Sequence, residues 1–219
     1  CVGGLDQMTV AISGGSGLVS YQWQSSTDGN APWANAVGTG STTNTFTPPS
    51  VTPGTTYYRV LVNATGSDCQ QAVSSVVTAI IIPDITVTTQ PTNVNECVGG
   101  LDQMTVAISG GSGLISYQWQ SSTTGAEPWA NATGTGSTTN TFTPPSATPG
   151  TTYYRVLVNA SNSDCQQAVS SVVTAIIIPD ITVTTQPTNV NECIGGLDQM
   201  TVAMSGGSGL ISYQWQSST

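Results

Sequence analysis

The chain of 219 residues repeats its own sequence at a fixed spacing. Cys1, Cys97 and Cys193 each begin a near-copy of the same sequence, which sets a period of 96 residues. Residues 1–96 and 97–192 differ at eight positions, and six of these, at 28, 30, 31, 37, 65 and 66, fall in stretches that we interpret as loops. Repeats of this kind form near one-dimensional arrays in which each unit contacts its neighbours. Because the chain starts and stops inside a repeat, we expect it to be a window on a longer array.

Within one period the apolar residues alternate over short segments separated by turn signals, and no segment shows a helical period. This alternation predicts strands in six segments: Ile85–Gln90, Met104–Ile108, Ile115–Gln120, Thr139–Thr143, Tyr154–Val158 and Gln166–Ile178. About seven short strands per period favour an antiparallel β-sandwich.

The spacing of large core residues makes this fold prediction more specific. Trp119 follows Val106 by 13 residues and precedes Val156 by 37, and Tyr154 lies two residues before Val156. This pattern is similar to that of an immunoglobulin domain whose two core cysteines are replaced by valine. We therefore predict an all-β fold of tandem immunoglobulin-like antiparallel β-sandwiches, with the following core residues: Trp23, Trp119, Val106, Val156 and Tyr154.

The predicted strands divide the chain into three repeats. The first repeat, 1–82, lacks its first strand; the second, 83–178, is complete; the third, 179–219, holds only the first strands of a truncated repeat.

Four short motifs carry a resemblance to a known family: Glu96–Gly100, Tyr117–Gln120, Tyr153–Val156 and Asp164-Cys165. They resemble the immunoglobulin-like tandem repeats of very large secreted cell-surface proteins, of the adhesin and gliding type, of Bacteroidota. The resemblance implies export, an extracellular or cell-surface location, and adhesive or gliding-related roles. The matched residues belong to the scaffold, so they identify no ligand site.

Charge and composition exclude most kinds of side-chain catalysis and nucleic-acid binding. The chain has a net charge of -9, two cationic side chains (Arg59 and Arg155), no Lys and no His. Without imidazole or lysine amine the common nucleophile-activating pairs cannot be built, and two arginines cannot neutralise several phosphates. No apolar stretch approaches the roughly 20 residues that span a bilayer. We therefore expect no enzyme, no cofactor, no nucleic-acid partner and no membrane span in this segment.

The five cysteines are interpreted as disulfide partners because the chain has the composition of a secreted protein. Cys97 lies nine residues before Val106, and Cys165 lies nine residues after Val156. In an immunoglobulin-like sandwich these thiols would lie at opposite ends, roughly 20–30 Å apart. A disulfide needs Cα atoms within about 7 Å.

The short Pro83-Asp84 linker is expected to bring the end of one sandwich against the facing end of the next. We therefore favour an inter-repeat disulfide between Cys1 and Cys165. The other cysteines, Cys69, Cys97 and Cys193, would pair outside the chain or stay free. The alternative, with Cys1–Cys69 and Cys97–Cys165 inside their repeats, remains open because the loop 97–102 could fold back.

Three other groups of residues are candidate sites. Asp6, Asp84 and Asp164 are expected near the same junction and form a weak calcium candidate, although solvated loop acids are the simpler interpretation. Trp33 and Trp129 follow proline in a variable loop, where they could stack on sugars or pack over the edge of the sandwich. Glycosylation sequons occur at three asparagines: Asn63, Asn131 and Asn159.

Three hypotheses of function follow. The first is a structural stalk or filament segment of a large extracellular protein, whose partners are the neighbouring repeats of the same chain. The second is that the repeats themselves are adhesive modules for surface glycans and gain avidity from many copies. The third is a pilus-like polymer in which one chain donates an edge strand to another.

Overall fold

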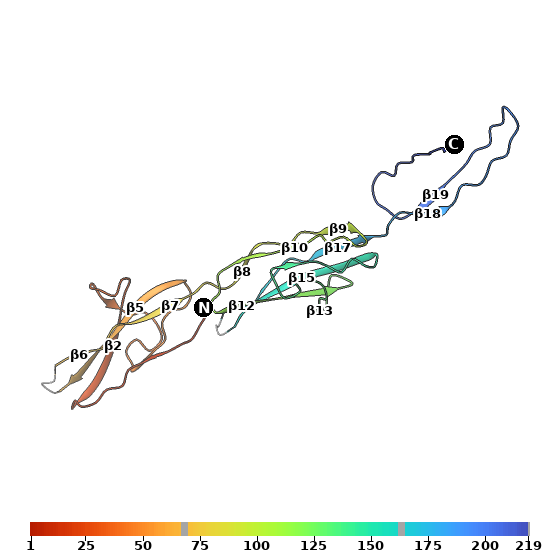
Figure 1. The fold of residues 1–219 in the computed structure, drawn as a ribbon. Coiled ribbons are helices and arrows are strands. Elements are labelled where there is room, and N and C mark those ends of the chain that lie inside the picture. Colours follow the sequence, from red (N-terminus) through yellow and green to blue (C-terminus); the bar gives the residue numbers. More distant parts are fainter. Residues whose placement is uncertain (67–69, 162–164, 219) are drawn as a thin grey trace. The chain divides into compact units, whose positions relative to one another are not determined.

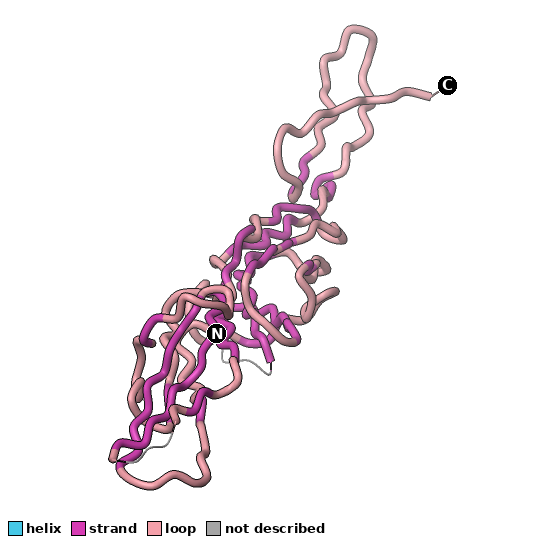
Figure 2. Tube along the Cα trace, turned by 90° about the vertical axis from the view of Figure 1, so that its left-hand side faces the viewer, coloured by secondary structure: helices cyan, strands magenta, loops and turns pink. Residues whose placement is uncertain are grey.

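A computed structural model describes residues 1–66, 70–161 and 165–218 (Figure 1). The described residues form strands, turns and loops and contain no helix (Figure 2). The predicted all-β fold is therefore confirmed.

Two compact units divide the chain. The first unit combines 1–86 with 108–116 and 158–168; the second combines 87–107 and 117–157 with the residues from 169 onward. The units cross the repeat boundaries because two segments of the second repeat, 108–116 and 158–168, belong to the first unit. The boundaries 1–82, 83–178 and 179–219 therefore stay a prediction about the sequence.

The first repeat folds as two small sheets. One sheet has the order β3–β2–β5–β6, with β7 also paired to β5, and the other joins β1 to β4. Its strands are β1 (Met8–Thr9), β2 (Leu18–Ser26), β3 (Ala34–Asn35), β4 (Thr45–Phe46), β5 (Gly54–Thr65), β6 (Ala72–Val73) and β7 (Val77–Ile81). Buried residues from both sheets form one cluster, namely Trp23, Ala36, Phe46, Tyr58 and Val60. The strands thus bury their inward faces against one another, as in a sandwich.

The second repeat has the same plan with additional strands. The large sheet has the order β13–β12–β15–β17–β9, with β16 paired to β15, while β10 pairs with β14 and β11 with β8. Its strands are β8 (Thr86–Thr89), β9 (Val94–Cys97), β10 (Met104–Thr105), β11 (Ala107–Ser109), β12 (Leu114–Ser122), β13 (Ala130–Asn131), β14 (Thr141–Phe142), β15 (Gly150–Ser161), β16 (Ala168–Val169) and β17 (Val173–Ile178). In the third repeat β18 (Thr182–Thr185) pairs with β19 (Ala203–Ser205).

The structure differs from the predicted strands in four places. Met104–Ile108 was predicted as one strand but forms β10 and β11, which Val106 separates, and β13 lies in a stretch that was not predicted as a strand.

The segment Gln166–Ile178 was predicted as one strand, but it forms β16 and β17 with a break at 170–172. At this break the Ser170 hydroxyl accepts a hydrogen bond from the backbone N–H of Val156 at 3.0 Å and donates one to the Ser171 carbonyl at 2.9 Å. The Ser170 hydroxyl therefore takes the place of a backbone hydrogen-bond acceptor in the sheet. The alternation of apolar residues in the sequence does not reveal such a substitution.

Strand β9 was not predicted at all. It pairs in parallel with β17, and Val94 lies opposite Ala175 in the register. Its four residues follow Pro91 closely and are mostly polar, so they have no apolar alternation that would mark a strand. The pairing depends on the edge of β17, which is distant in sequence.

The predicted core residues lie inside the two sandwiches. Trp119 and Val156 are 0% exposed, Val106 1%, Trp23 3% and Tyr154 4%. The Trp119 indole N–H donates to the Thr139 carbonyl at 2.9 Å, and its ring stacks on Phe142 with centroids 5.1 Å apart. Phe142 and its counterpart Phe46 were missing from the predicted core, although both are fully buried.

Candidate functional site

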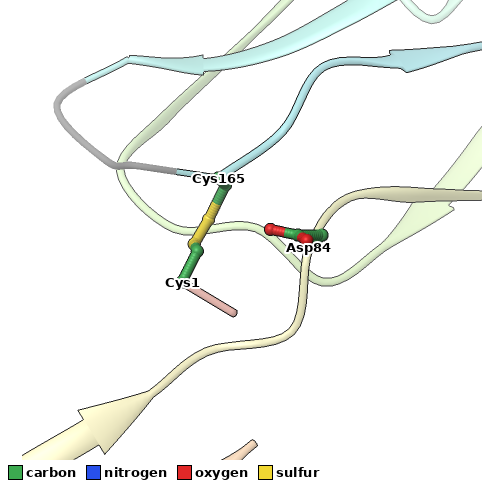
Figure 3. A group of neighbouring side chains, drawn as sticks. All are labelled: Cys1, Asp84 and Cys165. Atoms are coloured by element: carbon green, nitrogen blue, oxygen red, sulfur yellow. A yellow bond between two sulfur atoms is a disulfide. The ribbon is translucent and has the colours of Figure 1, made fainter. Parts of the chain in front are cut away.

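A disulfide between Cys1 and Cys165 is the centre of the candidate site (Figure 3). The two Cα atoms lie 4.9 Å apart, within the usual range for a disulfide. Both residues belong to the first unit, but they come from different repeats of the sequence. The bond therefore links two residues separated by 164 positions.

Asp84 lies beside this disulfide. Figure 3 shows its side chain next to the two sulfur atoms, and a carboxylate oxygen and both sulfurs lie within 4.8 Å of one another. The Asp84 carboxylate also accepts a hydrogen bond from the backbone N–H of Gln166 at 3.2 Å. This bond attaches the linker residue to the position immediately after Cys165.

The Gly110 to Gly113 turn supports the same linker from another side. Gly111 N–H donates to the Pro83 carbonyl at 2.8 Å, and Ser112 Oγ lies 3.9 Å from Cys165 Sγ. Gly110 has a φ of 75°, and a Cβ there would collide with the backbone oxygen of Asp84. The glycine-rich sequence carries no signal that this turn also receives the linker.

The arrangement does not support the calcium candidate. Asp6 is exposed and does not belong to the described cluster, and Asp164 lies outside the described residues. Asp84 is thus the one carboxylate that the described cluster contains, and disulfide sulfurs are not thiolate ligands. The expectation that the three aspartates gather therefore stays a prediction.

The remaining cysteines are arranged as follows. Cys97 and Cys193 are free and exposed, and Cys69 lies outside the described residues. Because Cys165 is bonded to Cys1, the alternative Cys97–Cys165 pair is not formed.

The tryptophans of the variable loop lie under arginine side chains. The Arg59 guanidinium carbon is 4.4 Å from the centre of the Trp33 ring, and Arg155 lies at the same distance from Trp129. Each arginine Nε also donates to a glutamine Oε1 at 2.9 Å, and Arg155 forms an ion pair with Glu127 at 3.1 Å. One face of each half-buried ring is therefore already occupied.

The sequon asparagines differ in their surroundings. Asn63 and Asn159 are half-buried, and their side-chain oxygens accept hydrogen bonds from Gln71 and Gln167 at 2.9 and 2.7 Å. Asn131 is exposed on β13. Glycosylation of these residues stays a prediction.

Among the described residues, three ionisable groups have a pKa shifted from the ordinary value. Burial raises the pKa of the Tyr58 and Tyr154 phenols, partly opposed by hydrogen bonds to Thr56 and Thr152. The pKa of Asp28 is lowered, chiefly because its carboxylate accepts a hydrogen bond from the backbone N–H of Asn30 and secondly one from the Ser26 hydroxyl. Each of these shifts has a local structural cause and none lies at the disulfide.

A comparison with protein families identifies a family for most of the chain. A family model described as Domain of unknown function (DUF8696) matches residues 1–83 and 86–179. No curated protein sequence matches the chain.

Solved structures with a similar fold were found at low sequence identity. A structure of Sidekick-1 immunoglobulin domains 1–4 is 14% identical, with a TM-score of 0.37, over 77% of this chain and 46% of that one. A structure of the N-terminal eight Ig domains of Down Syndrome Cell Adhesion Molecule is 12% identical, with a TM-score of 0.48, over 78% of this chain and 22% of that one. Titin domains I67–I69 are 11% identical, with a TM-score of 0.43, over 78% of this chain and 59% of that one. This chain thus covers less than two thirds of each of these structures.

The described residues contain no helix long and apolar enough to cross a membrane.

Proposed function

This chain belongs to the domain family described as Domain of unknown function (DUF8696), and we propose that it is a structural segment of a large extracellular surface protein. In this proposal tandem immunoglobulin-like repeats form a stalk or filament, and disulfides join successive repeats. The resemblance to secreted proteins of Bacteroidota supports this location. Near-identical tandem copies without lysine or histidine suit a load-bearing role better than catalysis.

The Cys1–Cys165 disulfide is the observation that carries the proposal. It joins positions from two successive repeats, so force applied along the chain would pass through the bond instead of through the residues that it encloses. A covalent bond keeps these two positions together even when a sandwich unfolds. If the same pairing recurs with the period of the sequence, a disulfide joins each repeat of a longer array to its neighbour.

Single-molecule stretching of the chain between its termini tests this load path. With the disulfide intact, the residues between Cys1 and Cys165 should add nothing to the unfolded length. The Cys165→Ser variant should release about 164 more residues, which is roughly 540–590 Å of extended chain. Cys193→Ser is the matched control and should leave the oxidised length unchanged. Equal unfolded lengths for the oxidised chain and Cys165→Ser would contradict the proposal.

A second candidate function is adhesion by the repeats themselves. Three of the sequence differences between repeats, at 28, 30 and 31, lie in the loop that precedes Trp33. In the second repeat one of these changes supplies Glu127, which pairs with the arginine that covers Trp129. Glycan arrays with the whole chain separate the two functions, because a purely structural segment binds no glycan.

A further inference from the structure

Asp84 places a negative charge beside the Cys1–Cys165 disulfide (Figure 3). One of its carboxylate oxygens and the two sulfur atoms all lie within 4.8 Å of one another. All three residues belong to the first unit, and each is half-buried. At this separation a carboxylate acts strongly on any other charge that forms on either sulfur.

The surrounding backbone holds the Asp84 carboxylate in this place. One of its oxygens accepts a hydrogen bond from the Gln166 N–H at 3.2 Å. The carbonyl of Pro83, the preceding residue, accepts one from the Gly111 N–H at 2.8 Å. Because the Asp side chain is short and its backbone is held, the carboxylate has little freedom to turn away from the sulfurs.

No cationic side chain in the described part of the chain neutralises Asp84. The sequence contains Arg59 and Arg155 as its two cationic residues, and both guanidinium groups lie over tryptophan rings. Among the described residues, the one ion pair between side chains involves Arg155 and not Asp84. The repulsion between this carboxylate and an approaching anion is therefore not cancelled by a neighbouring cation.

The conformation at Cys1 does not come from its place at the beginning of the sequence. Cys97, its counterpart in the second repeat, follows other residues and lies in the same turn. The Gly100 N–H donates to the Cys97 carbonyl at 3.0 Å, and the Gly4 N–H donates to the Cys1 carbonyl at 3.1 Å. Cys97 is exposed, so this turn leaves its cysteine accessible to thiols in solution even when other residues precede it.

Reduction of a disulfide by a thiol brings negative charge to both sulfurs. The thiolate of the reductant attacks one sulfur and bonds to it, and the electron pair of the broken S–S bond leaves on the other sulfur, which takes a proton from water. A second reductant thiolate then breaks the mixed disulfide, which yields the oxidised reductant and two protein thiols. A fixed carboxylate opposes the first step because it repels both the incoming and the departing thiolate.

We propose that Asp84 protects the Cys1–Cys165 disulfide from reduction by thiols, and most strongly from thiols that carry additional negative charge. Because the carboxylate lies near both sulfurs, attack on either one meets the same repulsion. Removal of a unit charge a few ångströms away should accelerate the reaction about three- to tenfold. This inference goes beyond the load-bearing role, because it concerns the chemistry of the bond and not the force on it.

The rate at which the disulfide opens in the whole oxidised chain tests the proposal. The free thiols are alkylated first, and the α-amino group is acetylated, which the absence of lysine makes selective. Cysteamine, 2-mercaptoethanol and 2-mercaptoethanesulfonate form a series of reductants with increasing negative charge. Each rate is divided by the rate of the same reductant with a small uncharged disulfide. Alkylation at set times, followed by trypsin, measures the release of peptide 1–59 from peptide 156–219.

Asp84→Asn removes the charge and keeps an oxygen that can accept the hydrogen bond from Gln166. It should accelerate reduction by 2-mercaptoethanesulfonate most and reduction by cysteamine least, and salt at about 1 M should diminish the difference. In the unchanged chain the normalised rate should fall from cysteamine to 2-mercaptoethanesulfonate. Asp102→Asn is the matched control, because it removes the same charge from an exposed side chain outside the cluster, and it should leave all rates unchanged.

Several outcomes overturn the proposal. Unchanged rates in Asp84→Asn would mean that the carboxylate does not protect the bond. Equal acceleration with all three reductants would assign the effect to looser packing and not to charge. An equal effect of Asp102→Asn would assign it to the net charge of the chain. Equal normalised rates for the three reductants in the unchanged chain would also overturn it.

Discussion

The guanidinium of Arg155 lies over the ring of Trp129, with its central carbon 4.4 Å from the ring centre. Arg59 repeats this contact on Trp33 in the first repeat. The sequence contains two arginines and no lysine, so both cationic side chains are used in the same way. The contact attaches the loop before each tryptophan to the long strand that carries the arginine.

This contact should contribute more to stability than the ion pair beside it. We expect Arg155→Ala to lower the free energy of unfolding by about 1–2 kcal/mol, because it removes the ring contact and the hydrogen bond to Gln120. Glu127→Ala restores the residue type of the first repeat and should cost less than about 0.5 kcal/mol, since the Glu127 side chain is 74% exposed. Urea denaturation followed by tryptophan fluorescence measures both changes. Equal losses in the two variants would contradict this ranking.

Tryptic mapping should identify the disulfide directly. Cleavage after Arg59 and Arg155 yields the peptides 1–59, 60–155 and 156–219. The Cys1–Cys165 disulfide joins the first peptide to the third and leaves the middle peptide separate without reductant. Disulfides inside the repeats would instead join all three peptides through the middle one. Mass spectrometry before and after reduction distinguishes these products, and Cys165→Ser is the control that should release the first peptide.

Ser170 and Ser74 form a matched pair for testing the strand break. Both hydroxyls accept a hydrogen bond from a backbone N–H of the neighbouring strand at 3.0 Å. Ser170 is 7% exposed, whereas Ser74 is half-buried. Ser170→Ala should cost about 1–3 kcal/mol because the Val156 N–H loses its partner away from water. Ser74→Ala should cost less because water can replace the hydroxyl, and urea denaturation would reveal a reversed order.

The buried tyrosines predict a loss of stability in alkali. Burial raises the pKa of Tyr154 and Tyr58 above the ordinary value of 10.0. The unfolded chain then releases these protons at lower pH than the folded chain. Their contribution to stability is complete below about pH 10 and is lost as the pH rises through the folded-state pKa.

Ultraviolet absorbance of tyrosinate during a pH titration measures this shift. Tyr58 and Tyr154 should ionise above pH 10 as a late component of the titration, and this component should shrink in Tyr154→Phe. Absence of the late component, with the protein still folded, would contradict the predicted shift.

Local sequence information was enough to predict the all-β fold and most of the strands. Alternation predicts a strand wherever one face is apolar and buried, as in the segment that contains Tyr117 and Trp119. The spacing of Trp119 from Val106 and Val156 indicated a sandwich because those positions fit its inward faces. Phe142 lies in the predicted strand Thr139–Thr143, but it was missed as a core residue because it is the one apolar residue of that segment, which leaves no alternation to mark an inward face.

The candidate site was less predictable. A simple spacing argument led to Cys1 and Cys165 as the favoured pair, but alternatives remained open. Asp84 was expected at this junction, but its hydrogen bond to Gln166 and the close approach of Gly110 were not foreseen, because they join segments distant in sequence. Nothing in the sequence around Arg155 indicates that it covers Trp129.

By itself, the sequence determined the period, the alternation of strands and turns, and the residue types available for chemistry, because these are properties of short segments. The tertiary structure decided which strand edges are covered, which cysteines meet and which side chains are buried. Val77 and Val173 make this division clear: they have the same local sequence, yet 41% and 6% of their surfaces are exposed. Exposure depends on residues brought against each side chain by the fold, and Val173 lies in β17, whose edge pairs with β9.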